Sequence, residues 1–203
     1  MTVARIHGLL ASVSIGVSMS GICFVAAAQS PASRAAFDAE TLALDNKSNL
    51  FRLTKPRIRQ GDIRIEADEA LATSVDVEAG GEWELTGHVH IELDGVVLDG
   101  DSTAFTFANG QLSRFELTGS PASVEDRSST RRRPVRGSAA TLQYDDVERR
   151  LLLSGDAVLI RGQSTIHSCS MAYDFDDESF QSVETPACPD PRMRITTQRA
   201  DGR

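Results

Sequence analysis

The chain has 203 residues, of which 40% are hydrophobic, and its formal net charge is −8 at pH 7. This length suits one domain behind an N-terminal targeting segment. The excess of negative charge argues against nucleic acid as a partner and against general attraction to an anionic membrane. An anionic lipid would have to be bound by burial of its apolar part or by a local basic cluster.

The first 28 residues have the features of a secretory signal peptide. Arg5 supplies a positive start, and no residue from 6 to 28 carries a formal charge unless His7 is protonated. Ala26-Ala27-Ala28 then supplies the small residues that precede a cleavage site at Gln29. The alternative is an uncleaved membrane anchor, because the segment is long enough to span a bilayer. We expect cleavage after Ala28 and export of the mature chain.

Residues 29–55 are mixed in composition, with a weak helical pattern over 35–40, and we expect a linker or N-terminal arm there. Residues 56–182 are expected to form the folded domain, because apolar and polar residues alternate in segment after segment. The clearest alternation covers residues 82–93, with Trp83 and Leu85 on the apolar face. Prolines and charges after residue 182 predict a poorly ordered tail over 183–203.

A short phrase repeats through the predicted domain, roughly every 30–40 residues: Leu85-Thr86-Gly87, Leu117-Thr118-Gly119 and Leu153-Ser154-Gly155. A fixed period of this kind indicates stacked copies of one supersecondary unit. The glycine inside the strand pattern predicts a bend or a bulge. Asp94-Gly95 and Asn109-Gly110 are signals for two-residue hairpin turns. The fold class predicted from these features is all-β, built from repeated antiparallel meander units.

When the repeated units are stacked, their apolar positions form a continuous stripe across the strands, which we expect to face the inside of the domain. An ordinary β core accounts for part of it, and small residues such as Ala67 and Gly100 favour an interior that is not completely filled. The candidates for the lining of that interior are Trp83, Leu85, Ile91, Phe105, Phe107, Phe115, Leu117, Tyr144, Leu153, Leu159 and Phe175.

Two cysteines, Cys169 and Cys188, remain after removal of the first 28 residues. An even number in an exported protein favours one disulfide between them. The alternative is a pair of independent thiols, one of them in the tail.

Signatures of enzymes are scarce. The chain lacks G-x-S-x-G, H-E-x-x-H and the P-loop motif. His88-Val89-His90 could supply half of a metal site, as in cupin-type jelly rolls, but the alternation puts both histidines on the polar face. We therefore expect no catalytic residue, metal or cofactor, with a metal-dependent cupin-type enzyme as the alternative. Arg131-Arg132-Arg133 with Arg136 could bind phosphates or carboxylates, or form an exposed loop without a function.

Several phrases in this order resemble the LptA/OstA family of periplasmic lipopolysaccharide transport proteins over most of the predicted domain. The matching phrases are Ile63-Arg64-Ile65-Glu66-Ala67-Asp68-Glu69-Ala70, Leu85-Thr86-Gly87-His88-Val89-His90-Ile91, Leu98-Asp99-Gly100-Asp101-Ser102-Thr103-Ala104, Val135-Arg136-Gly137-Ser138-Ala139-Ala140 and Leu153-Ser154-Gly155-Asp156-Ala157-Val158-Leu159. The arginine insert and the cysteine pair are departures from the common pattern.

The resemblance implies a twisted β-jellyroll, open at its ends, whose apolar interior shields the acyl chains of lipid A in the periplasm. It also implies a bridge from the inner to the outer membrane, with LptC-like and LptD-like partners and possible head-to-tail self-association. An LptC-like relative that keeps its N-terminal anchor is the alternative within the same family.

Overall fold

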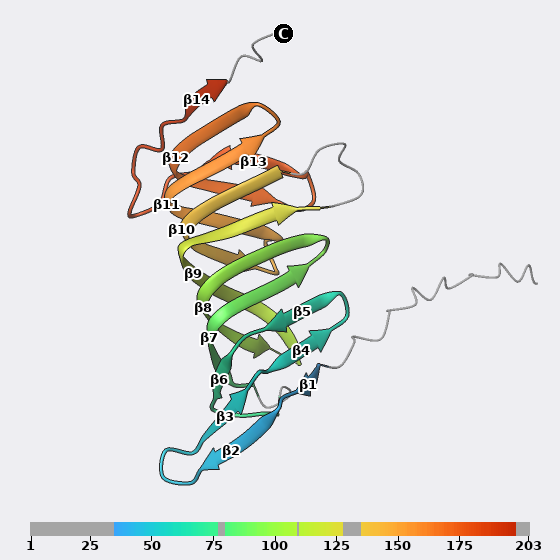
Figure 1. Cartoon of the computed structure of the whole chain (residues 1–203). Helices are drawn as coiled ribbons and strands as arrows, with labels where there is room; N and C mark the ends of the chain where they lie inside the picture. The colour runs from blue at the N-terminus through green and yellow to red at the C-terminus, as the bar shows by residue number, and fades with distance from the viewer. Residues whose placement is uncertain (1–34, 77–79, 109, 128–134, 198–203) are drawn as a thin grey trace, which may run out of the picture. The chain divides into compact units, whose positions relative to one another are not determined.

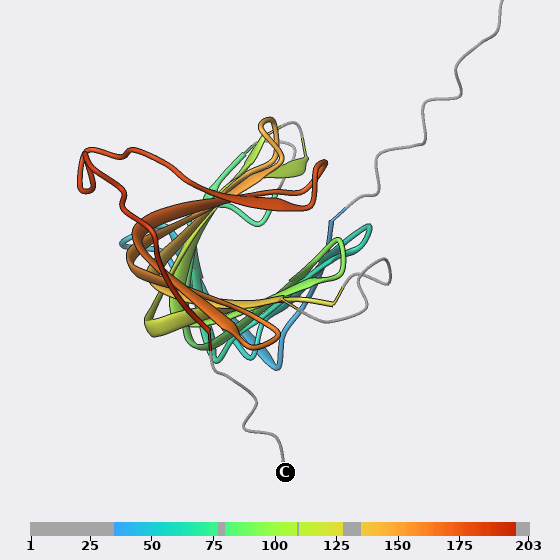
Figure 2. The same ribbon diagram turned by 90° about the horizontal axis from the view of Figure 1, so that it is seen from above.

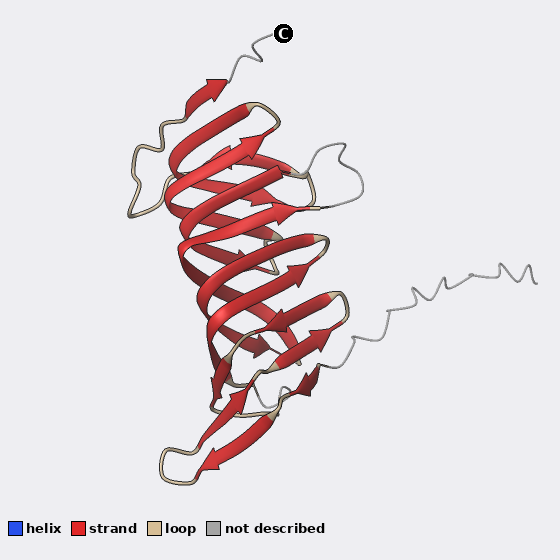
Figure 3. Cartoon of the chain, in the orientation of Figure 1, coloured by secondary structure: helices blue, strands red, loops and turns tan. Residues whose placement is uncertain are grey.

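The computed structural model describes residues 35–76, 80–108, 110–127 and 135–197, which all belong to one compact unit, Ala32–Arg203. All the secondary-structure elements in these ranges are strands (Figure 3), so the all-β fold expected from the alternation is confirmed. None of the described residues lies in a helix that is long and apolar enough to cross a membrane.

Six long strands form the body of the fold. They are β7 (Glu82–Leu93), β8 (Val96–Ala108), β9 (Gln111–Asp126), β10 (Val135–Asp145), β11 (Arg150–Arg161) and β12 (Ser164–Asp174). The short strands are β1 (Ala36–Asp38), β2 (Thr41–Asp45), β3 (Leu50–Thr54), β4 (Arg57–Gln60), β5 (Ile63–Glu66), β6 (Glu69–Ala72), β13 (Ser179–Ser182) and β14 (Arg194–Thr197). All of them join one antiparallel sheet, in which β7 to β12 lie side by side in chain order (Figure 1).

The sheet is curled into two halves that face each other, as Figure 2 shows from above. The strand pairing defines them, because each long strand contributes one segment to each half. Half A contains residues 82–86 of β7 and 170–174 of β12, and it is extended by β6 and β13. Half B contains residues 89–93 of β7 and 164–168 of β12, and it is extended by β5 and β14.

The strands pass from one half to the other at a line of bulges, here called the spine. In β7 the register shifts between Thr86 and Val89, and Gly87 and His88 have φ angles of 77° and 45°. In β11, Gly155 and Asp156 occupy the same place in the repeat, with φ angles of 79° and 50°. The bend predicted at the glycine of the repeated phrase is therefore confirmed at both positions, since positive φ is readily adopted by glycine.

The opposite edge, where the hairpin turns of the two halves approach each other, is here called the mouth. Asp94-Gly95 forms one of these turns, with φ angles of 49° and 79°, as the predicted type of hairpin requires. Gly110 also has a positive φ, of 74°, while Asn109 lies outside the described residues.

The structure differs from the linker expected over residues 29–55, because residues 36–54 contain three strands. Here β2 pairs with β3, β3 pairs with β6, and β1 pairs with β4. The weak helical pattern over 35–40 is overridden by tertiary packing, since Phe37 stacks on Trp83 with ring centroids 5.0 Å apart. The segment expected as a disordered tail also contributes a strand, because β14 pairs with β12. Residues 1–34, including the predicted signal peptide, lie outside the described ranges.

Gly87→Ala is expected to lower the free energy of unfolding by about 3 kcal/mol. A Cβ at this position would lie 2.5 Å from a carboxylate oxygen of Asp68, in addition to the strain of its positive φ. Gly80→Ala is the matched control, because Gly80 has a φ of 73° but its nearest neighbour would be 3.6 Å away. The control is expected to cost about 1 kcal/mol in the same urea titration. Equal losses of unfolding free energy in the two variants would contradict tight packing around Gly87 at the spine.

Candidate functional site: the apolar interior and its mouth

The two halves pack their apolar inner faces against each other and form one hydrophobic cluster. Ten of the eleven sequence-predicted lining residues are buried in it, and Phe175 is partly buried. On half A these are Trp83, Leu85, Phe105, Phe107, Phe115, Leu117, Tyr144 and Leu153, and on half B they are Ile91 and Leu159. The structure brings the predicted set together, and it shows the interior closed around these side chains.

Aromatic rings are concentrated in two groups on the half A side of the interior. The first group is centred on Trp83, which stacks on Phe37 and on Phe105, with Phe107 at its edge. The second links Phe115 to Tyr144, with ring centroids 5.2 Å apart, and continues through Phe175, Tyr173 and Phe180. Phe37 was not expected as an inner residue, because it lies in the segment predicted to be a linker.

The apolar inner face continues to both ends of the sheet, where it becomes exposed. At the N-terminal end, Leu42 and Leu44 of β2 lie in register with Leu53 and Phe51, yet they are 59% and 47% exposed. At the other end, Ile195 of β14 lies opposite Ile166 of β12 and is 63% exposed. The interior is therefore covered along its length but not at its two ends.

Within the described ranges, polar side chains connect the two halves across the mouth at three places. Gln60 of β4 donates to the carbonyl of Gly110 and accepts from the amide of Leu112 at 3.0 Å. Arg149, between β10 and β11, donates to Asp94 at 3.0 Å. The hydroxyl of Tyr173 on β12 donates to the carboxylate of Asp126 on β9 at 2.8 Å. We call these three contacts the latch.

The protonation states at the mouth are set by neighbouring groups. Hydrogen bonds to Asp94 and then to Asp176 hold the pKa of the Arg149 guanidinium above its ordinary value. The guanidinium also lies over the ring of Phe175, 5.8 Å from its centroid. Burial, followed by the hydrogen bond to Asp146, raises the pKa of the Tyr144 hydroxyl. Arg149 therefore stays charged and Tyr144 stays neutral across the physiological pH range.

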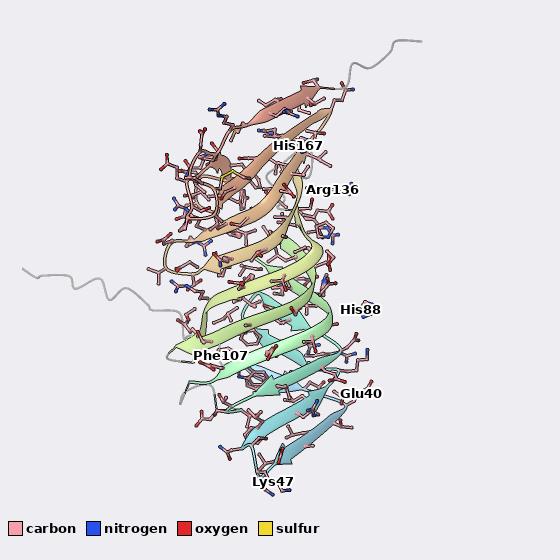
Figure 4. All side chains as sticks on the ribbon, turned by 90° about the vertical axis from the view of Figure 1, so that its left-hand side faces the viewer. Glu40, Lys47, His88, Phe107, Arg136 and His167 are labelled. Atoms are coloured by element: carbon pink, nitrogen blue, oxygen red, sulfur yellow. A yellow bond between two sulfur atoms is a disulfide. The ribbon has the colours of Figure 1, made fainter. Side chains whose placement is uncertain are left out.

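The two histidines noted as half of a metal site lie outside the interior. The His88 side chain is 93% exposed (Figure 4), and its Nδ1 lies 2.6 Å from Asp68, while His90 Nδ1 lies 2.6 Å from Asp99. Hydrogen bonds from Lys55 and then from His88 lower the pKa of Asp68. Among the described residues there is no group of three or more histidines, cysteines or carboxylates that could hold a metal ion.

The basic cluster proposed from sequence is only partly described. Arg136 of β10 faces outward and forms an ion pair with Glu125, with N and O atoms 3.0 Å apart. Glu125 also pairs with Arg127 at 2.7 Å. Residues 131–133 lie outside the described ranges.

A disulfide joins Cys169 of β12 to Cys188, with the two Cα atoms 5.8 Å apart. Cys188 is buried and exchanges backbone hydrogen bonds with Thr185. The bond thereby holds the segment after β13 against the last long strand, close to the C-terminal end of the interior.

A separate cavity of about 860 Å³ lies over the outer face of half A. Glu84, Ala104, Glu116, Gln143 and Leu152 line it and lie in register across β7 to β11, on the side opposite the interior. Of this row, the alternation over residues 82–93 places Glu84 on the polar face, whereas Ala104 was expected to point inward and is exposed instead.

Together, the curled sheet, the apolar inner face and the open ends define a β-jellyroll built around an apolar interior. Residues 37–179 match the family described as LptA/(LptD N-terminal domain) LPS transport protein, and the chain belongs to this family. No curated protein matches the sequence. The chain is similar in structure to LptH of Pseudomonas aeruginosa, described as the LptA-homologous periplasmic component of the conserved lipopolysaccharide transport device. The match has a TM-score of 0.52 and 15% identity and covers 82% of this chain and 96% of that one, which supports the shared fold.

Cys188→Ser is expected to lower the free energy of unfolding by about 3 kcal/mol, because the bond constrains the unfolded chain. The double variant Cys169→Ser/Cys188→Ser is the control, and its loss is expected to equal that of the single variant. Mass spectrometry of the unreduced wild-type protein should show no free thiol at either position. Two thiols that react with an alkylating reagent before reduction would contradict the pairing.

Proposed function

We propose that the chain is a periplasmic lipopolysaccharide-binding transport protein, which shelters the acyl chains of lipid A between half A and half B. The observation that carries this proposal is the apolar inner face, which runs without a break from β2 to β14. Each methylene removed from water is worth about 0.8 kcal/mol, so acyl chains can leave a bilayer only for an apolar shelter. Membership of the LPS transport family supports lipopolysaccharide as the ligand.

The net charge of the chain agrees with recognition through the acyl chains. The protein carries a formal charge of −8, so its general field repels an anionic glycolipid. Binding must then come from burial of the acyl chains, and the aromatic groups around Trp83 and Tyr144 offer large apolar surfaces for it. Because these residues are packed against each other, acyl chains must displace contacts between the halves.

The ends of the sheet support a place in a chain of similar domains. Among the described strands, β2 pairs only with β3 at the N-terminal end and β14 pairs only with β12 at the C-terminal end, so each offers an edge for pairing. Strand pairing at these edges would continue the inner face from one molecule to the next. We propose head-to-tail contacts with further copies or with LptC-like and LptD-like partners. Export after cleavage behind Ala28 belongs to the same proposal, and N-terminal sequencing of the mature protein tests it.

Photo-crosslinking residues at Phe107 and Leu117 are expected to capture lipopolysaccharide, because both side chains belong to the interior. Residues of the same kind at His88 and Glu92, on the outer face, are the controls and should remain unlabelled. Equal labelling at all four positions, or labelling at none, would contradict the proposal. Depletion of the protein should also reduce the lipopolysaccharide that reaches the outer membrane.

Leu44→Glu is expected to weaken head-to-tail association, because it places a charge on the exposed inner side of β2 at the open end. Ala43→Glu is the matched control, since Ala43 neighbours Leu44 on the same strand but points to the outer face. Analytical ultracentrifugation over a range of concentrations measures the effect. Identical association of both variants and the wild type would exclude this end of the sheet as the contact.

A further inference from the structure

The three contacts of the latch occupy equivalent places along the mouth. In each, an element of half B meets an element of half A that lies further along the sheet order: β4 meets the β8–β9 turn, the β7–β8 turn meets the β10–β11 turn, and β9 meets β12. The offset along the sheet order is between three and four strands in each case, and it follows the twist of the sheet. A contact that recurs with the repeat is a property of the fold and not an accident of one turn.

The three contacts differ in burial. The side chains of Arg149 and Asp94 are 39% and 37% exposed. By contrast, Gln60 and Asp126 are 8% and 1% exposed, and both project from the inner face of half B into the interior. Polar groups that are buried at the edge of an apolar cluster are stable only while their hydrogen bonds are satisfied. When the mouth opens, water can form hydrogen bonds with these polar groups. When it closes, each group needs its hydrogen-bond partner on the other half.

We propose that the latch holds the mouth shut in the empty protein, and that it opens so that the two halves separate when acyl chains enter the interior. This inference rests on the proposed function. The halves cannot separate at the spine, because the strands are continuous through it and its bulges are tightly packed. The mouth is joined only by side-chain and turn contacts among the described residues, so it can separate without breaking a strand pair.

The exposed and the buried contacts of the latch stabilise the closed state to different degrees. An exposed ion pair is screened by water and stabilises little, so the Arg149–Asp94 pair exchanges readily. A buried hydrogen bond to a carboxylate costs more to break, so Tyr173 and Asp126 contribute most to the closed state. Arg149 keeps its charge in both states, because a guanidinium group stays protonated at physiological pH even without a partner.

A covalent staple across the mouth gives the direct test. Asp94→Cys and Arg149→Cys are joined with a bismaleimide, which does not react with the Cys169–Cys188 disulfide. The control staple joins Arg114→Cys to Asp145→Cys, which face each other on β9 and β10 within half A. Both proteins carry a photo-crosslinking residue at Leu117 and are mixed with purified lipopolysaccharide. The staple across the mouth is expected to lower labelling at least about tenfold, and the control staple is expected to leave it unchanged.

Variants that weaken the latch are expected to have the opposite effect. Asp94→Asn should raise the initial rate of labelling up to about fivefold, while Asp145→Asn, which removes a pair within half A, should not. Tyr173→Phe should raise the rate by at least about tenfold, because it removes the donor to buried Asp126. Circular dichroism of each variant shows whether the sheet is intact.

The outcomes separate the two proposals. If wild-type protein is labelled and the staple across the mouth has no effect, the latch is overturned and the transport function stands. If lipopolysaccharide labels neither the wild-type protein nor any variant at Leu117, the proposed function fails, and the latch fails with it. Reduced labelling with the mouth staple alone supports both.

Discussion

The structure depends on one geometric constraint: each long strand must keep its apolar side chains on the inside while it turns from one half of the sheet to the other. In β7 and β11 this is achieved by two consecutive residues with positive φ, so the apolar positions keep their alternation from Leu85 to Val89 and from Leu153 to Ala157. In β10 the inner positions instead shift by one residue at the spine, from Ala139 to Leu142. Both solutions keep the inner faces of the two halves opposed.

This constraint explains how a closed interior can belong to a lipid carrier. In the described part of the chain, the halves are joined by continuous backbone at the spine but only by side chains and turns at the mouth. Separation at the mouth therefore costs apolar contacts and a few hydrogen bonds, and acyl chains can restore the apolar contacts. A carrier whose empty interior closes on itself avoids exposing a large apolar surface to water. At the two ends of the sheet the inner face stays exposed, so residues such as Leu44 and Ile195 are available for apolar contact with neighbours.

Much of this fold can be predicted from the sequence, because the informative signals are local. Alternation identified the long strands, and the repeated glycine identified the spine at Gly87 and Gly155. The short N-terminal strands could not be predicted, because β1 and β3 are stabilised by distant partners, β4 and β6. The lining candidates were found together in the interior, but the sequence alone cannot divide them into lipid contacts and plain core. The latch was missed because polar residues such as Asp126 are normally assigned to solvent, and only the packed structure shows where they point.

The central claim is that lipid occupies the space between the inner faces and not a surface outside the sheet. Methyl NMR of the isotope-labelled mature protein tests it most directly, with spectra recorded before and after addition of purified lipopolysaccharide. The account predicts large shifts for the inner methyl groups of Leu85 and Leu153, whereas Leu152 on the outer face and exposed Val147 stay unchanged. Shifts confined to Leu152 and its outer neighbours, with the inner methyl groups unaffected, would contradict the account.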